Sequence, residues 1–258
     1  MMMSLSLKDK LRQGQTVYGL FNSIPHPLII EMIAASGYDF VIIDTEHTAI
    51  NDETLENMIR AAETAGITPL VRVSQSIERD IIKVLDMGAR GIVVPHVESR
   101  KRAEDIVKLS RYYPEGMRSL NGGRMPRFGE MSLTEYMREA NDSLVVIAMI
   151  ESQQGLNVLD EIVSVDGIDM IIEGAADLSQ SFGIPWQTTN EVVQKATHYI
   201  FEIAKHYNKG FIALPREASQ FKAWQAKGVT TFVLGDDRGK FYRHLKQEHL
   251  SFKGGASS

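Results

Sequence analysis

Eight short runs of β-branched and other apolar residues recur along this chain, and each is followed by a stretch with helical spacing of apolar residues. The runs cover residues 17–22, 39–44, 68–73, 91–96, 145–150, 169–174, 210–215 and 230–235. Strands that alternate with helices form parallel sheets with crossover connections. Eight such units in 258 residues predict an α/β fold, a closed (β/α)8 TIM barrel.

The spacing of these runs also predicts the domain organisation. No linker rich in Pro, Gly or Ser divides the chain, so we expect one domain over residues 1–258. A last helical stretch, at about 236–250, follows the eighth run and could pack on its own barrel or on a neighbouring subunit.

Composition excludes several classes of function. A formal net charge of −5 argues against a nucleic-acid partner. The absence of cysteine excludes disulfides, thiolate nucleophiles and Cys-ligated metals, so the chemistry must come from His, carboxylate, Arg and backbone groups. No segment has the length of a membrane span or the apolar core of a signal peptide, and we expect a cytoplasmic protein without membrane contact.

Ionisable residues follow several of the predicted strands. In α/β barrels, catalytic groups lie at the carboxyl ends of the strands. Here those ends carry the segment 44–47 (DTEH), Arg72, His96, Glu151 and the segment 173–177 (EGAAD). The sequence therefore predicts one polar site at this end of the barrel.

Arg72 interrupts an apolar strand, where an unpaired guanidinium would be very costly to bury. A bidentate carboxylate of a 2-oxo acid would suit it, and an ion pair with a barrel carboxylate is the alternative. Asp44 and His47 are close enough for the carboxylate to orient the imidazole as an acid/base pair, or both could cap the next helix. Glu46 could support this pair or be solvated. His96 could donate to a substrate carbonyl or fill a polar niche.

Glu151 and Asp177 follow neighbouring strands and could hold Mg²⁺ or Mn²⁺ together with substrate oxygens and water. The alternative is that both carboxylates accept hydrogen bonds from Arg72 and loop amides. The small residues Gly174, Ala175 and Ala176 could let backbone N–H groups approach a substrate carboxylate, although an ordinary turn would look similar.

The segment 114–137 is longer than a barrel loop requires and is rich in Gly and Arg. We expect an active-site loop or lid here. Arg118, Arg124 and Arg127 could attract the phosphates of coenzyme A, and a solvated loop or a subunit contact is the alternative.

Taken together, the motifs resemble those of the HpcH/HpaI aldolase family, metal-dependent class II pyruvate aldolases with a phosphoenolpyruvate/pyruvate-type barrel. They are GLFNS, DFVIIDTEH, PLVRV, LDMGARGIVVPHV, MIES and EGAADLSQSFG. The resemblance implies that Arg72 holds the pyruvate carboxylate and that Glu151 and Asp177 bind the metal. It assigns proton transfer to Asp44 and His47, and places Asp86 in the outer part of the site, often reached from a neighbouring subunit. It also implies a homo-oligomer, a hexamer built from dimers that exchange the C-terminal helix.

Several residues depart from the usual aldolase pattern around the substrate. Ala175 replaces a proline, Phe21 a tryptophan and His96 often a methionine, and the segment 118–129 differs as well. These departures resemble a citrate synthase branch of the family that serves synthesis of the siderophore staphyloferrin B. That branch implies oxaloacetate and acetyl-CoA as substrates and no required cofactor, although Glu151 and Asp177 could still take Mg²⁺, Mn²⁺ or Ca²⁺.

Two other functions remain open from the sequence. One is a divalent-metal aldolase acting on 4-hydroxy-2-oxo acids. The other is a regulatory barrel that senses a 2-oxo acid without converting it, which the dense set of ionisable strand-end residues disfavours.

Overall fold

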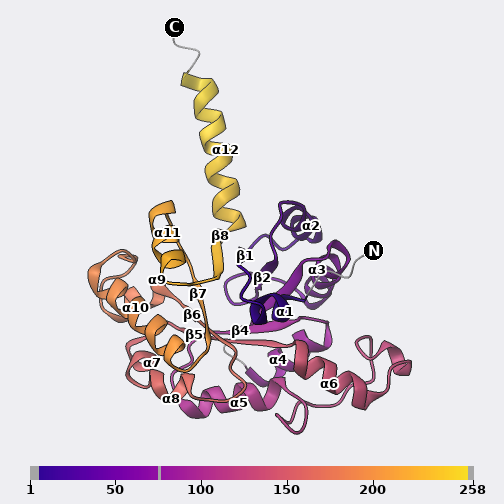
Figure 1. Ribbon diagram of the computed structural model, residues 1–258. Helices are drawn as coiled ribbons and strands as arrows, with labels where there is room; N and C mark the ends of the chain where they lie inside the picture. The colour runs from indigo at the N-terminus through magenta and orange to yellow at the C-terminus, as the bar shows by residue number, and fades with distance from the viewer. Residues whose placement is uncertain (1–5, 75–76, 255–258) are drawn as a thin grey trace.

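The computed structural model describes residues 6–74 and 77–254, and it contains the predicted barrel (Figure 1). Eight parallel strands close in sequence order, with β1 paired to both β2 and β8. The strands are β1 (Val17–Asn22), β2 (Phe40–Asp44), β3 (Thr68–Arg72), β4 (Gly91–Val94), β5 (Val145–Ile150), β6 (Met170–Glu173), β7 (Gly210–Ala213) and β8 (Thr231–Asp236). All eight predicted strands are confirmed, with ends that differ by at most two residues.

The structure describes twelve α-helices, most of which surround the barrel on the outside. They are α1 (Leu7–Arg12), α2 (Pro27–Ala35), α3 (Asp52–Ala65), α4 (Ile77–Asp86), α5 (Arg100–Ser110), α6 (Leu133–Ser143), α7 (Gln153–Asn157), α8 (Leu159–Val163), α9 (Ala175–Ser181), α10 (Glu191–His206), α11 (Ala218–Ala226) and α12 (Asp237–Gly254), with a short 3-10 helix at Arg127–Gly129. None of the described helices is long and apolar enough to cross a membrane.

The core has two layers, which follow from the two-residue period of a strand. In β2, Phe40 and Ile42 point into the barrel, whereas Val41 and Ile43 pack against the surrounding helices. Gly19 lies on the neighbouring strand, where an added Cβ would be 2.1 Å from the Phe40 ring. The absence of a side chain at Gly19 therefore lets Phe40 fill the interior.

The direction of the strands separates two ends of the barrel. The carboxyl ends carry Asp44, Arg72, His96 and Glu151, as predicted. The amino ends are closed in part by α1, whose Leu7 joins the interior apolar cluster. Helices run back from the carboxyl end to the amino end, so segments that follow a helix lie at the amino end.

The Arg-rich segment is not placed as a lid on its own barrel's polar end. It follows α5 rather than a strand, and it packs on the last turns of α3 and α4. Arg118 donates to Asp86 (2.7 Å), and Arg124 donates to Glu63 (2.7 Å). A lid on its own barrel is therefore not formed, because a segment that follows a helix begins at the amino end of the barrel. The alternatives of a solvated loop or a subunit contact stay predictions.

The helix α12 extends away from the barrel (Figure 1). Its first residue, Asp237, is buried and accepts hydrogen bonds from Asn22 and from the backbone N–H groups of Ser23 and Ile24. Beyond this anchor the helix exposes large apolar side chains: Phe241, Tyr242, Leu245, Leu250 and Phe252.

Candidate active site

Arg72 and Asp44 form the centre of the polar cluster at the carboxyl end. They are paired residues of the adjacent strands β2 and β3, so the sheet register places both side chains on the same face. Arg72 Nε and Nη2 donate to the two Asp44 carboxylate oxygens at 2.9 and 2.7 Å. The Arg72 guanidinium also lies over the Phe21 ring, 5.0 Å from its centroid.

This pair changes the acidity of both groups. Burial by itself would raise the pKa of Asp44, but the hydrogen bonds and the charge of Arg72 lower it below its ordinary value. Burial by itself would lower the pKa of Arg72, but the hydrogen bonds and charge of Asp44 raise it above its ordinary value. Both groups therefore stay charged near neutral pH.

The expected pairing of Asp44 with the His47 imidazole is not formed. The carboxylate of Asp44 instead accepts the backbone N–H groups of Glu46 and His47, at 3.1 and 3.3 Å, while binding Arg72. The His47 side chain is 59% exposed. Asp44 thus shapes the turn after β2 and holds Arg72, and it does not orient the imidazole.

Glu46 connects the charged groups of the site, whereas the sequence allowed only a supporting role beside Asp44 and His47 or a solvated side chain. Its side chain is largely buried, and its carboxylate lies 3.3 Å from Arg72 Nη1. The His47 and His96 rings approach the same carboxylate, at 3.7 and 3.9 Å. A carboxylate shared by one guanidinium and two imidazoles can keep those rings close to a substrate held by Arg72.

His96 lies between Glu46 and Glu151. Its backbone adopts a positive φ of 50°, and its N–H donates to Glu151 Oε1 at 2.8 Å. Its ring Nδ1 is 3.6 Å from the same oxygen, and the side chain is 34% exposed. A partly exposed imidazole between two carboxylates is well placed to move a proton.

Glu151 is buried at the end of β5, and burial raises its pKa to about 7. The hydrogen bond and charge of His96 oppose this shift, whereas the nearby carboxylates of Glu46 and Asp177 add to it. A carboxyl with a pKa near the working pH can both accept and return a proton.

Gly174 makes room for Glu151. An added Cβ at Gly174 would lie 2.4 Å from Glu151 Oε2 and 2.6 Å from Glu151 Cβ. The residue after β6 must therefore be glycine if Glu151 is to keep its position.

A second buried carboxyl, Glu173, was also missed as a site residue. Burial raises its pKa to about 7, opposed by the charge of Arg216 and by a hydrogen bond from the Ala175 backbone N–H. Within the described residues, Glu173 Oε2 has no hydrogen-bond partner. The Ala175 amide that we expected to bind a substrate carboxylate is therefore engaged by Glu173. The sequence signal was a charged residue inside an otherwise apolar strand, as at Arg72.

The residues present fit a divalent cation only in part. Glu151 and Asp177 are close enough for the Asp177 charge to raise the pKa of Glu151, and a cation between them would relieve this repulsion. However, residues 6–74 and 77–254 contain no group of three His or carboxylate side chains arranged to hold a metal. A cation here would need substrate or water oxygens as its remaining ligands.

Comparison with known proteins places this chain in a family. The family model described as HpcH/HpaI aldolase/citrate lyase matches residues 17–241. The solved structure of the citrate synthase SbnG is 58% identical with a TM-score of 0.93, and the match covers 99% of this chain and 100% of that chain. The structure of an HpcH/HpaI aldolase from Desulfitobacterium hafniense DCB-2 is 28% identical with a TM-score of 0.90, and covers 97% of both chains. The 2-keto-3-deoxy-L-rhamnonate aldolase of Escherichia coli is 33% identical, over 98% of this chain and 95% of that protein.

Proposed function

Because the chain belongs to the HpcH/HpaI aldolase/citrate lyase family, we propose that it is a citrate synthase that condenses oxaloacetate with acetyl-CoA. The observation that carries the proposal is that Arg72 and the His96 imidazole approach the same carboxylate, Glu46, and that His96 lies between Glu46 and Glu151. Such a site can hold a 2-oxo acid next to a side chain that transfers protons. The 58% identity to a citrate synthase over nearly the whole chain favours this reaction over others of the family.

Oxaloacetate would bind through one carboxylate to Arg72. The guanidinium has five N–H groups, and Asp44 takes one on Nε and one on Nη2. Three N–H groups remain, two on Nη1, which also faces Glu46 at 3.3 Å, and one on Nη2. A carboxylate could accept one hydrogen bond from each of these two nitrogens in a bidentate manner. The backbone amide of Ala176, in the turn that begins at Gly174, is a further donor in this proposal, with Asp177 beside it.

Proton transfer would then use the groups around His96. A base removes a proton from the acetyl methyl group, and the resulting enolate attacks the ketone carbon of oxaloacetate. The new alkoxide takes up a proton, and water cleaves the thioester to release coenzyme A and citrate. We assign the base to Glu151 or His96, and stabilisation of the developing alkoxide to Arg72. His47, exposed at the rim, would exchange protons with solvent through Glu46.

A divalent cation is not required by this scheme. If Mg²⁺, Mn²⁺ or Ca²⁺ binds, Glu151 and Asp177 would hold it, and its chemistry would be to polarise the oxygens of the 2-oxo acid. A divalent-metal aldolase is the second candidate function, and the 33% identity to the rhamnonate aldolase favours it.

The test is product analysis with and without chelator. Purified protein is incubated with oxaloacetate and acetyl-CoA, in parallel with pyruvate and an aldehyde, each with and without EDTA. We expect citrate from the first pair in both conditions. An aldol product from the second pair that disappears with EDTA, without citrate from the first, would overturn the proposal in favour of the aldolase.

The citrate would be used in the synthesis of a siderophore such as staphyloferrin B. This part of the proposal rests on the citrate synthase branch of the family that the sequence resembles. Deletion of the gene should then reduce siderophore output under iron limitation, and added citrate should restore it. A deletion strain that secretes siderophore normally would contradict this role.

We also propose that α12 is exchanged between subunits of a homo-oligomer, a hexamer built from dimers. The exposed apolar side chains of Phe241, Tyr242 and Leu245 support this, because such residues are usually covered by a partner. Light scattering on the full chain and on a chain truncated after Asp236 would test it, with smaller particles expected for the truncated form. Equal masses would contradict the exchange.

A further inference from the structure

A second pocket, of about 790 Å³, opens at the amino end of the barrel. Its walls include Val145, Met170, Gly210 and Thr231, which are the first residues of β5, β6, β7 and β8. Arg72, His96 and Glu151 lie at the opposite ends of their strands. The pocket is therefore separated from the candidate active site by the length of the barrel.

The lining of this pocket is strongly cationic. Six of its residues are basic and three are acidic, although the whole chain has a formal net charge of −5. The basic residues are Lys8, Arg12, Arg111, Lys205, Lys209 and Lys227, and the acidic residues are Glu115, Asp142 and Asp169. Cations concentrated in a concave site raise the local concentration of anions.

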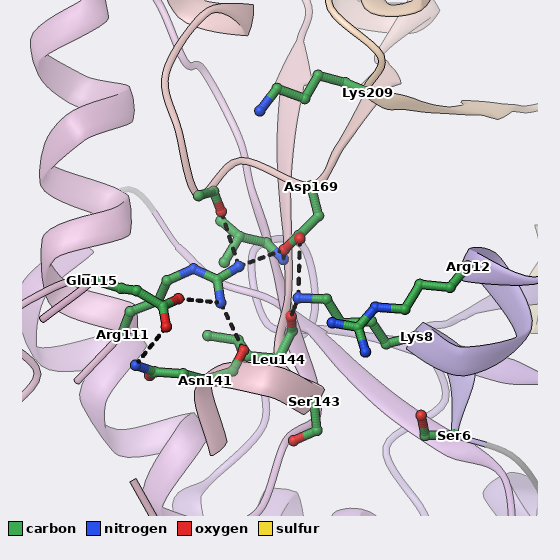
Figure 2. Close-up of polar contacts among 12 residues, drawn as sticks. Ser6, Lys8, Arg12, Arg111, Glu115, Asn141, Ser143, Leu144, Asp169 and Lys209 are labelled. Atoms are coloured by element: carbon green, nitrogen blue, oxygen red, sulfur yellow. Dashed lines mark hydrogen bonds and ion pairs between the residues drawn. The ribbon is translucent and has the colours of Figure 1, made fainter. Parts of the chain in front are cut away.

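The carboxylate of Asp169 contacts two of these cations. Arg111 Nη2 donates to Asp169 Oδ2 at 2.7 Å, and Lys8 Nζ lies 3.1 Å from Asp169 Oδ1. Figure 2 shows Arg111 on one side of Asp169, with Lys8 and Arg12 on the other. Burial, together with the charges of Arg111 and Arg12, lowers the pKa of Lys8 despite its contact with Asp169. The two cations Arg111 and Lys8 thus share the carboxylate of Asp169.

The Arg111 guanidinium is 97% buried in this wall, with 3% of its side chain exposed. Its two terminal nitrogens donate to the carbonyls of Asn141 and Gly167 as well as to Asp169. Within the described residues, its Nε has no hydrogen-bond partner. Arg111 Nη1 also lies 3.5 Å from Glu115 Oε2, so two carboxylates compensate its charge and Arg111 mainly fixes the wall.

Three lysines supply charge that no carboxylate neutralises within the part of the chain that the structure describes. Lys209 donates to the carbonyl of Val165 at 3.3 Å, and Figure 2 shows its side chain above Asp169, apart from Arg111 and Lys8. Lys205 and Lys227 both lie over the Phe201 ring, with Nζ atoms 5.8 and 6.0 Å from its centroid. Phe201 thus brings two ammonium groups to one apolar wall of the pocket.

We propose that this pocket binds a small organic polyanion, with two or more carboxylate or phosphate groups on a carbon skeleton. The anionic groups would contact Lys205, Lys209 and Lys227, each of which has ammonium protons to donate. The carbon skeleton would pack on the apolar part of the lining, which includes Leu11, Phe201 and Val229. Such a ligand would contact α1, α10 and the loop after α11 at the same time. Because it binds only the folded state, it would stabilise the protein.

Isothermal titration calorimetry on the Arg72→Ala variant tests the proposal without turnover or binding at the active-site arginine. Pyrophosphate and citrate are the probes, titrated into this variant and into a form that also carries Lys205→Ala, Lys209→Ala and Lys227→Ala. The matched control carries Lys101→Ala, Lys195→Ala and Lys222→Ala, which remove three exposed lysines from outer helices.

We expect one or both probes to bind, with affinity at least tenfold lower in the pocket variant and unchanged in the control. The tighter probe identifies the preferred anionic group. A form with Lys→Arg at the same three pocket positions should retain binding, because the charge is kept. Absence of binding to the Arg72→Ala protein, or equal affinity in the pocket variant, would overturn the proposal. Neither result depends on whether the enzyme makes citrate.

Discussion

Arg72 and Asp44, paired across β2 and β3, join through two hydrogen bonds of 2.9 and 2.7 Å. Because Asp44 occupies one edge of the guanidinium, the orientation of the whole group is fixed and its Nη1 side faces Glu46. The ion pair that we weighed as an alternative to substrate binding is therefore present, and it can position the arginine for a ligand.

Replacing Arg72 should abolish citrate formation. Arg72→Ala removes the proposed carboxylate contact and leaves Asp44 buried without its partner, so we expect kcat/KM to fall by about a hundredfold or more. Steady-state kinetics with oxaloacetate as the varied substrate provide the measurement, with circular dichroism to check folding. Arg72→Lys keeps the positive charge but loses the planar guanidinium that binds a carboxylate through two parallel hydrogen bonds. This variant should recover only part of the activity. An Arg72→Ala enzyme with near-normal KM for oxaloacetate would contradict the placement of the substrate.

The acidity of Glu151 predicts the pH dependence of the reaction. Burial raises its pKa to about 7, and a general base must be deprotonated to accept a proton. We therefore expect kcat/KM to rise with pH between about 6 and 8, with a midpoint near 7. Glu151→Gln should lose most of the activity, whereas Glu161→Gln, on the outer helix α8, should leave the profile unchanged. A rate that does not vary over this range would exclude Glu151 as the base.

Glu173 should make the folded protein less stable as the pH rises. Its pKa of about 7 lies above the ordinary value of 4.5, so the folded state binds this proton more tightly than the unfolded state. The resulting stabilisation is complete below pH 4.5 and is lost as the pH rises through 7. Glu173→Gln should therefore be more stable than the wild type at pH 8, by up to on the order of 3 kcal/mol, with little gain at pH 5. Urea unfolding at both pH values measures this, and an equal difference at pH 5 and pH 8 would contradict it.

Gly174 should be intolerant of a side chain. In Gly174→Ala the new Cβ would meet Glu151 Oε2 at 2.4 Å, so Glu151 must move. Displacement of a catalytic group by about 1 Å can cost on the order of a hundredfold in rate, and we expect a loss of tenfold or more in kcat. Gly122→Ala is the control, because nothing lies within 4 Å of its added Cβ. Equal kcat values for the two variants would show that Glu151 is not positioned by this contact.

Several site residues could be predicted from the sequence of a single strand, because a charged residue in an apolar run is informative by itself. Arg72 and Glu151 were identified in this way, and the structure brings both to the same end of the barrel. The sequence did not show which side chain each charged residue contacts. Asp44 was assigned to His47, three positions away, whereas the sheet register pairs it with Arg72, which is 28 residues away. The same limit applies to Glu46: the sequence allowed a supporting role for it, but did not show that its contacts come from three different strand ends.

The sequence by itself determined the barrel, because the alternation of apolar runs and helices is a local pattern that repeats eight times. It also determined which strand ends carry ionisable groups. Only the tertiary structure decided which of those groups meet, that the Arg-rich segment lies at the amino end, and that Lys8, Asp169 and Arg111 converge beneath the barrel. These arrangements depend on strand register and on where each helix ends, which bring distant residues together without leaving a periodic signal in the chain.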